Sequence, residues 1–167
     1  MTKHIFRGKC IDDSREFNGK WVYGDLIHSD GKTYIHPQSN AVSVEMGLGR
    51  LIVMHEVDPD TVGVNTELVD GDGFPIYEGD VVEFESHGYI PGTDIGVVKF
   101  KDGCYGIEYL PKWCREHGWD SLFHRIGKTE EWRDMGASGT ITYTYCVLGN
   151  IHDNPEFLDM WEESERR

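Results

Sequence analysis

Short runs in which apolar and polar residues alternate recur along most of the chain, and they limit it to a fold built mainly from β-strands. Such alternation covers residues 3–11 and 20–27. Asp30-Gly31 and Asp102-Gly103 each separate two further runs, and Asp-Gly supplies the positive φ angles that a tight hairpin needs. Because a period of two places apolar side chains on one face of a strand, the pattern predicts antiparallel strands joined by turns.

The stretch YEGDVVEFE, residues 77–85, adds a more specific expectation. Glu78-Gly79-Asp80 reads as a turn whose glycine permits a backbone conformation closed to other residues, and the strand after it alternates in polarity. A Gly-Asp turn before a strand, with a second strand such as Gly96-Val97-Val98, is typical of small SH3-like barrels. We therefore expect an SH3-like β-barrel over residues 74–150, packed against an N-terminal β-meander over residues 1–66.

Two segments depart from this β pattern. Residues 112–135 interleave aromatic residues with charges at spacings that predict one or two short helices inserted between strands. Asn154-Pro155-Glu156 fits a helix start with proline at the first helical position, so residues 151–167 are predicted to form a helical tail.

Net charge and cysteine usage exclude some classes of partner. The formal net charge is −14, which weighs against direct binding to nucleic acid or to an anionic membrane, because both need a surplus of Lys and Arg. No run approaches the roughly 18 apolar residues of a membrane span. Four scattered cysteines and no apolar leader after Met1 favour a cytoplasmic protein with reduced thiols.

Motifs that follow one another along nearly the whole chain resemble those of the YopX family of phage and prophage proteins. They include turn sequences in the middle of the chain and a characteristic closing sequence. The matching segments are Phe6-Arg7-Gly8-Lys9, Trp21-Val22-Tyr23-Gly24, Tyr34-Ile35-His36, Asp58-Pro59-Asp60-Thr61-Val62-Gly63, Ile76-Tyr77-Glu78-Gly79-Asp80 and Gly149-Asn150-Ile151-His152-Asp153-Asn154-Pro155-Glu156. The resemblance implies a mainly β fold, an origin in a mobile genetic element and a location in the bacterial host cytoplasm. It carries over no catalytic residue.

One position departs from the family pattern. Where the family usually has glycine, this chain has Glu67. We expect the local turn to be rebuilt around that change.

Three groups of residues are candidate chemical sites, and each has a simpler structural reading. Cys104, Cys114, His117 and His124 are weak metal candidates because Cys and His are zinc ligands, but the spacing lacks a second closely spaced pair. Asp70-Gly71-Asp72-Gly73 is similar to the start of a calcium loop, but the twelfth position is Val81 and not glutamate. His55 and Glu56, near Asp58 and Asp60, lie on opposite faces of a strand, which separates them as catalytic partners. No cofactor is predicted.

The aromatic residues of the 112–135 segment are the interface candidates, with local packing as the alternative reading. Tryptophan is enriched where partners bury a surface as well as in cores. The candidates are Trp113, Trp119, Phe123 and Trp132. We expect a homo-oligomer that uses them and, as the function, a non-enzymatic accessory protein that binds another protein. The alternatives are an acidic DNA mimic that occupies a host DNA-binding protein and an enzyme whose site is dispersed over several strands.

Overall fold

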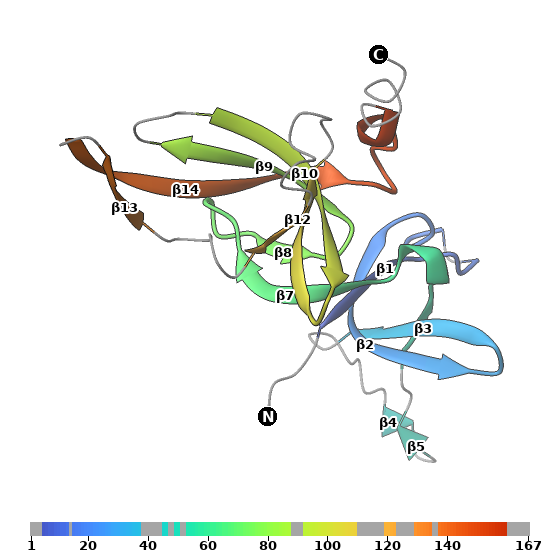
Figure 1. The fold of residues 1–167 in the computed structure, drawn as a ribbon. Helices are drawn as coiled ribbons and strands as arrows, with labels where there is room; N and C mark the ends of the chain where they lie inside the picture. The colour runs from blue at the N-terminus through green and yellow to red at the C-terminus, as the bar shows by residue number, and fades with distance from the viewer. Residues whose placement is uncertain are drawn as a thin grey trace. The chain divides into compact units, whose positions relative to one another are not determined.

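The computed structural model describes residues 5–13, 15–37, 45–46, 49–50, 53–87, 92–109, 119–122, 129–134 and 137–159. The chain divides into two compact units, Met1–Asn65 and Thr66–Arg167. Antiparallel strands predominate in both units, so the predicted mainly β class is confirmed (Figure 1). No helix among the described residues is long and apolar enough to cross a membrane.

The first unit is built on hairpins whose register follows the alternation in the sequence. Its six-stranded sheet has the order β6-β3-β2-β1-β7-β8, and β7 runs from the first unit into the second. The buried side chains include Val22, Ile35 and Val57, and Phe6 and Leu26 pack against them. The elements of the first unit are β1 (Phe6–Lys9), β2 (Trp21–Ser29), β3 (Lys32–Pro37), β4 (Glu45–Met46), β5 (Gly49–Arg50), β6 (His55–Glu56), the 3-10 turn η1 (Pro59–Thr61) and the start of β7 (Gly63–Val69), and β8 (Pro75–Tyr77) of the second unit completes the sheet order.

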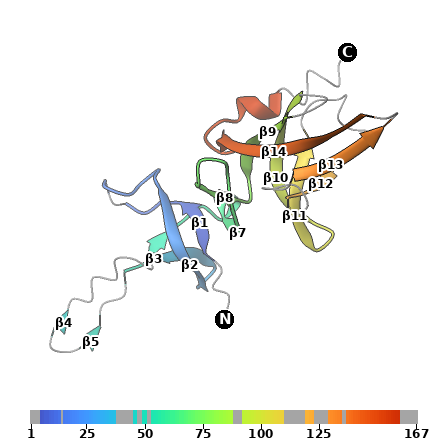
Figure 2. The ribbon, with the colours of Figure 1, turned by 90° about the vertical axis from the view of Figure 1, so that its left-hand side faces the viewer.

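The second unit contains a six-stranded sheet with the order β12-β11-β10-β9-β14-β13 (Figure 2). Val82 and Phe84 lie in the main buried cluster with Val98, whereas Val81 packs with Val97 in a separate cluster. The two faces predicted from alternation over residues 81–85 are therefore present. The strands are β9 (Asp80–His87), β10 (Gly92–Lys101), β11 (Cys104–Tyr109), β12 (Trp119–Ser121), β13 (Thr129–Asp134) and β14 (Ala137–Asn150).

The prediction of a closed SH3-like barrel over residues 74–150 is wrong for the strands described, because their sheet is open. β12 and β13 stand at its two ends and each pairs with a single neighbour. The reason lies in β14. Its first residues, Ala137 to Thr142, form a hairpin with β13, while β14 from Thr142 onward pairs with β9. The chain therefore adds a strand at one edge instead of returning to the other edge and closing the sheet.

The segment 112–135 also differs from the prediction. Trp119–Ser121 and Thr129–Asp134 are strands β12 and β13, where short helices were expected. Cross-strand pairing accounts for the difference, since β12 pairs with Gly106–Glu108 of β11 and β13 pairs with β14. Leu122 directly after β12 is helical and fully buried in the main cluster. The remainder of the segment lies outside the described residues.

The turn at Glu78-Gly79-Asp80 joins several strands through hydrogen bonds. Gly79 has a φ of 84°, and its N–H donates to the carbonyl of Val98 at 2.9 Å. The Asp80 carboxylate, 2% exposed, accepts the N–H of Tyr77 at 2.7 Å. The carbonyl of Gly79 in turn accepts the N–H of Ile151 at 3.0 Å. This motif is structural, because it ties β8, β10 and the segment after β14 to the start of β9.

The closing sequence of the chain folds back on the sheet. The Asn150 carboxamide oxygen accepts the N–H groups of His152 and Asp153, each at 3.0 Å. Residues 156–159 are helical, as predicted for the start of the tail, and Phe157 packs against Val81 and Val97. Residues beyond 159 lie outside the described part of the chain.

Candidate functional site

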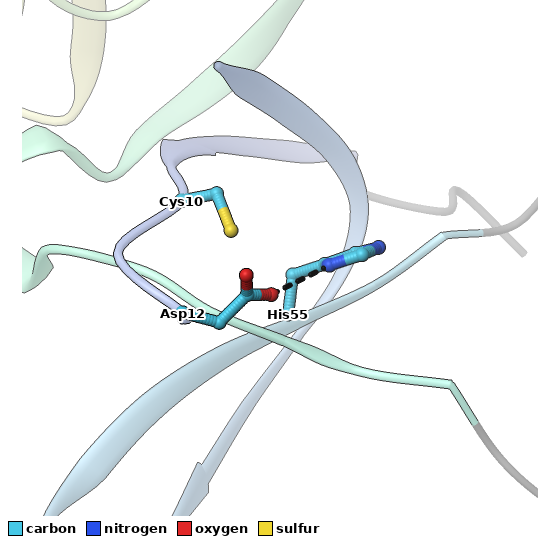
Figure 3. Close-up of side chains that lie close together, drawn as sticks. All are labelled: Cys10, Asp12 and His55. Carbon is cyan, nitrogen blue, oxygen red and sulfur yellow. Dashed lines mark hydrogen bonds and ion pairs between the residues drawn. The ribbon is translucent and has the colours of Figure 1, made fainter. Parts of the chain in front are cut away.

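Cys10, Asp12 and His55 bring a thiol, a carboxylate and an imidazole to one place in the first unit. Each offers one donor atom, and these atoms all lie within 4.8 Å of one another. Asp12 Oδ2 lies 3.0 Å from His55 Nδ1. Figure 3 shows the carboxylate between the thiol and the imidazole. The three residues come from two chain segments that are distant in the sequence.

Antiparallel pairing of these segments explains why the three side chains meet. Cys10 forms an isolated bridge with Val57, and the N–H of Ile11 donates to the carbonyl of Glu56 at 2.9 Å. Two residues further along the same register, Asp12 lies opposite His55. Residues two apart on an extended segment face the same side, so Cys10 and Asp12 both point toward the side on which His55 lies.

The surroundings hold the cluster in place. Cys10 is 0% exposed, and its backbone N–H donates to the Lys20 carbonyl at 2.9 Å. His55 is 7% exposed, and the centroid of its ring lies 4.4 Å from that of the Phe17 ring. Asp12 is the partly exposed member and gives the cluster its access to solvent. The site is therefore a mostly buried cluster of donor atoms whose carboxylate is partly exposed to solvent.

The electrostatics of the cluster argue against a thiol nucleophile. Burial raises the pKa of the Cys10 thiol above its ordinary value of 9.0, and the Asp12 side chain raises it further, while the backbone of Asp12 acts in the opposite sense. A reactive cysteine needs a lowered pKa. In a catalytic triad, the imidazole must also lie between the nucleophile and the carboxylate, so that it can accept the proton of the nucleophile. Here the carboxylate occupies that place (Figure 3).

The other residues near His55 in the sequence have separate structural roles. Glu56 Oε2 accepts a hydrogen bond from Lys32 Nζ at 2.7 Å. Asp58 Oδ1 accepts the N–H of Asp60 at 3.0 Å at the start of η1. The separation of His55 from Glu56 agrees with the alternation of side chains along the strand.

Of the four metal candidates predicted from the sequence, the structure describes only Cys104. Cys104 begins β11, and its Sγ lies 3.7 Å from the carbonyl oxygen of Lys101. Cys114, His117 and His124 lie outside the described residues, so that zinc prediction stays untested. The possible calcium loop is a turn, because Asp70 Oδ1 accepts the N–H groups of Asp72 and Phe74 at 3.0 and 2.8 Å.

Of the four interface candidates, the structure describes Trp119 and Trp132. Trp119 lies in β12 opposite Glu108, half-buried, with Lys101 Nζ 5.7 Å from the centroid of its ring. Trp132 lies in β13 opposite Gly139. Trp113 and Phe123 fall outside the described residues.

The sequence did not predict the cluster of Cys10, Asp12 and His55. Cys10 and Asp12 are spaced two apart, which is a signal that they share a face, but His55 is far from both in the chain. Only the pairing of residues 10–12 with residues 55–57 brings them together.

The fold defines a mainly β protein with antiparallel sheets, and the sequence motifs form the strands β1, β2 and β3 as well as turns and the start of a helix. The chain belongs to the YopX family, since the family model described as "YopX protein" matches residues 14–159. Cys10 and Asp12 precede the matched residues, whereas His55 lies within them. No curated protein matches the chain.

Proposed function

We propose that this chain is a phage- or prophage-encoded accessory protein that acts by binding protein, with a second copy of itself as one partner. Membership of the YopX family supports the phage-type origin. Several buried acidic and amide side chains support a non-catalytic role, because their oxygens accept backbone N–H groups. These side chains are Asp70, Asp80 and Asn150.

The observation that carries the proposal is an exposed aromatic pair at the end of the β10–β11 hairpin. Phe100 is 55% exposed, and its ring meets that of Tyr105 edge to face with centroids 5.0 Å apart. Val98 and Ile107 are both fully buried and form the pair two positions earlier in the register, which places them on the same face. An apolar stripe therefore runs from the buried cluster out to solvent on a firmly paired hairpin, and aromatic side chains on rigid elements are common anchors of protein interfaces.

The opposite face of the same hairpin is charged. Lys99 forms an ion pair with Glu108, and the ammonium of Lys101 lies over the ring of Trp119. That face carries paired charges beside the half-buried Trp119 ring, so the exposed aromatic pair of the hairpin lies on the Phe100 side.

The edge of the sheet next to this pair supports self-association. β12 is three residues long and pairs with Gly106–Glu108, so among the described residues no strand pairs with the outer edge of β11 at Cys104 and Tyr105. A second copy of the chain offers a strand that can pair with this edge while covering Phe100 and Trp119. Of the aromatic interface candidates, Trp119 in β12 lies at this edge, whereas Trp132 in β13 lies at the opposite end of the sheet.

The test is the mass in solution as the protein is diluted, measured by light scattering from micromolar concentration downward. One chain has a mass of 19.1 kDa. We expect a higher mass that falls on dilution, and Phe100→Ser or Trp119→Ala should weaken association by about 2 kcal/mol, or roughly 30-fold. Phe74→Ser is the matched control, because Phe74 is exposed on the turn before β8.

Two results contradict the proposed self-association. One is a single-chain mass at every concentration. The other is a Trp119→Ala variant with a lower melting temperature and an unchanged mass, which identifies that ring as part of the monomer core. Added salt should leave an apolar interface in place, whereas an interface built on the net negative charge would dissociate as screening increases.

A further inference from the structure

We infer that Cys10, Asp12 and His55 form a binding site for a zinc ion. Among the described residues they are the one group of three or more Cys, His, Asp or Glu side chains whose donor atoms gather within 4.8 Å. The group combines three donor types on two paired segments, so it is neither a patch of surface carboxylates nor an isolated cysteine.

The donor set selects the class of metal. Thiolate sulfur, imidazole nitrogen and carboxylate oxygen are the ligands that zinc uses in proteins. Calcium and magnesium take oxygen ligands almost exclusively, and a buried thiol beside the carboxylate makes the site unsuitable for them. The inference is therefore specific to zinc and to ions that resemble it in size and softness, such as cobalt(II).

The spacing of the donors is close to what a bound ion needs. Zinc binds sulfur at about 2.3 Å and nitrogen or oxygen at about 2.0 to 2.2 Å, which puts tetrahedral ligands about 3.5 Å apart. The Asp12 and His55 atoms are 3.0 Å apart, and no pair in the cluster exceeds 4.8 Å. Donor atoms within 4.8 Å of one another need to approach by only about 1 Å to reach the tetrahedral separation.

The charge balance also favours a divalent ion. On binding, the S–H bond of Cys10 is replaced by a bond from sulfur to zinc, and the proton passes to the solvent. Thiolate and carboxylate then carry two negative charges that the ion neutralises, with His55 neutral. Neutrality matters because Cys10 is fully buried, and an unpaired buried charge is costly. No electron is transferred, and the fourth position of the ion stays open to water through the exposed side of Asp12.

The test uses the full chain, freed of metal with a chelator and titrated with cobalt(II) as a spectroscopic probe and then with zinc. We expect one equivalent of cobalt to produce a cobalt–thiolate charge-transfer band that zinc removes by displacement, and we expect zinc to raise the melting temperature. Cys10→Ala should abolish the band. Asp12→Asn and His55→Gln should keep a thiolate band but weaken binding about tenfold or more.

Cys104→Ala and Cys146→Ala are the matched controls, since both cysteines lie outside the cluster and neither is buried. They should bind cobalt like the unmodified chain. Circular dichroism establishes that each variant is folded. If Cys10→Ala does not fold, Asp12→Asn decides the matter, because Asp12 is partly exposed and its replacement leaves the core intact.

Three outcomes overturn the inference. The first is the absence of a charge-transfer band at saturating cobalt. The second is a band that survives in Cys10→Ala and disappears in Cys104→Ala or Cys114→Ala, which would place the metal at the other group of cysteines and histidines. The third is cobalt affinity unchanged by both Asp12→Asn and His55→Gln. A loss of self-association in the Phe100 variant has no bearing on this site, so the two proposals fail separately.

Discussion

The carboxylate of Asp70 accepts a hydrogen bond from the backbone N–H of Val147 at 3.2 Å, across 77 positions of the sequence. Its other oxygen accepts the N–H of Phe74 at 2.8 Å. A single buried side chain therefore organises the turn before β8 and ties that turn to β14.

Asp70→Ala should lower the free energy of unfolding by about 1 to 3 kcal/mol, because it leaves three partly buried backbone N–H groups, those of Asp72, Phe74 and Val147, without their acceptor. Chemical denaturation monitored by circular dichroism measures the change. Asp72→Ala, two residues away and exposed, is the control and should cost less than about 0.5 kcal/mol. Equal losses for the two variants would show that the Asp70 carboxylate has no special role.

Gly96→Ala should destabilise the chain by about 1 to 3 kcal/mol through overpacking. A Cβ atom on Gly96 would lie 2.3 Å from Ile107 Cγ2 and 2.8 Å from the Glu108 carbonyl oxygen. Gly71→Ala is the control, since the nearest atom there would be the Tyr145 carbonyl oxygen at 3.4 Å. Thermal melts of both variants test this, and a tolerated Gly96→Ala would mean that β10 and β11 move apart at little cost.

Glu67→Gly should raise the free energy of unfolding by about 0.5 to 1 kcal/mol. Glu67 has a φ of 65°, a left-handed conformation that costs a residue with a side chain of order 1 kcal/mol and costs glycine little. Glu67→Ala is the control, because it removes the carboxylate but keeps the Cβ atom and the strain. A gain in both variants would assign the effect to charge instead of backbone conformation.

The phenol of Tyr105 should titrate above its ordinary pKa of 10.0. Burial raises its pKa first, and the negative charges of Glu78 and Glu67 raise it further. The folded state thus holds this proton more tightly than the unfolded chain, so the stabilisation is complete below pH 10 and is lost as pH rises through the folded pKa. The difference in phenolate absorbance between the unmodified chain and Tyr105→Phe isolates this group, and Glu78→Gln should move its midpoint downward. A midpoint at or below 10.0 contradicts the assignment.

Local features of the fold could be predicted from the sequence, because they depend on residues close together in the chain. Alternation placed Val82 and Phe84 on one face and Val81 on the other, and the glycine of the turn at residues 78–80 has the positive φ that its sequence indicates. The change of glycine to Glu67 was expected to rebuild the turn. Glu67 has a left-handed backbone conformation within β7.

Features that depend on distant pairing could not be predicted. The open sheet follows from the division of β14 between two partners, which no local pattern encodes. The aromatic residues at 119 and 132 suggested helices because their spacing suits a helical face as well as a strand edge. The cluster at Cys10 was missed for the same reason, since the register that sets His55 opposite Asp12 joins residues 43 positions apart.

The open sheet has a consequence for how such a protein can change over time. Residues 112–135 lie between β11 and β14 in the sequence. Both of these are interior strands of the sheet, whereas β12 and β13, the two strands described within the segment, lie at its two edges. Of the side chains described there, Leu122 alone joins the buried cluster. The segment can therefore be lengthened, shortened or exchanged by recombination while β9, β10, β11 and β14 keep their pairings. The outer strands of such a sheet can thus vary while its four interior strands stay unchanged.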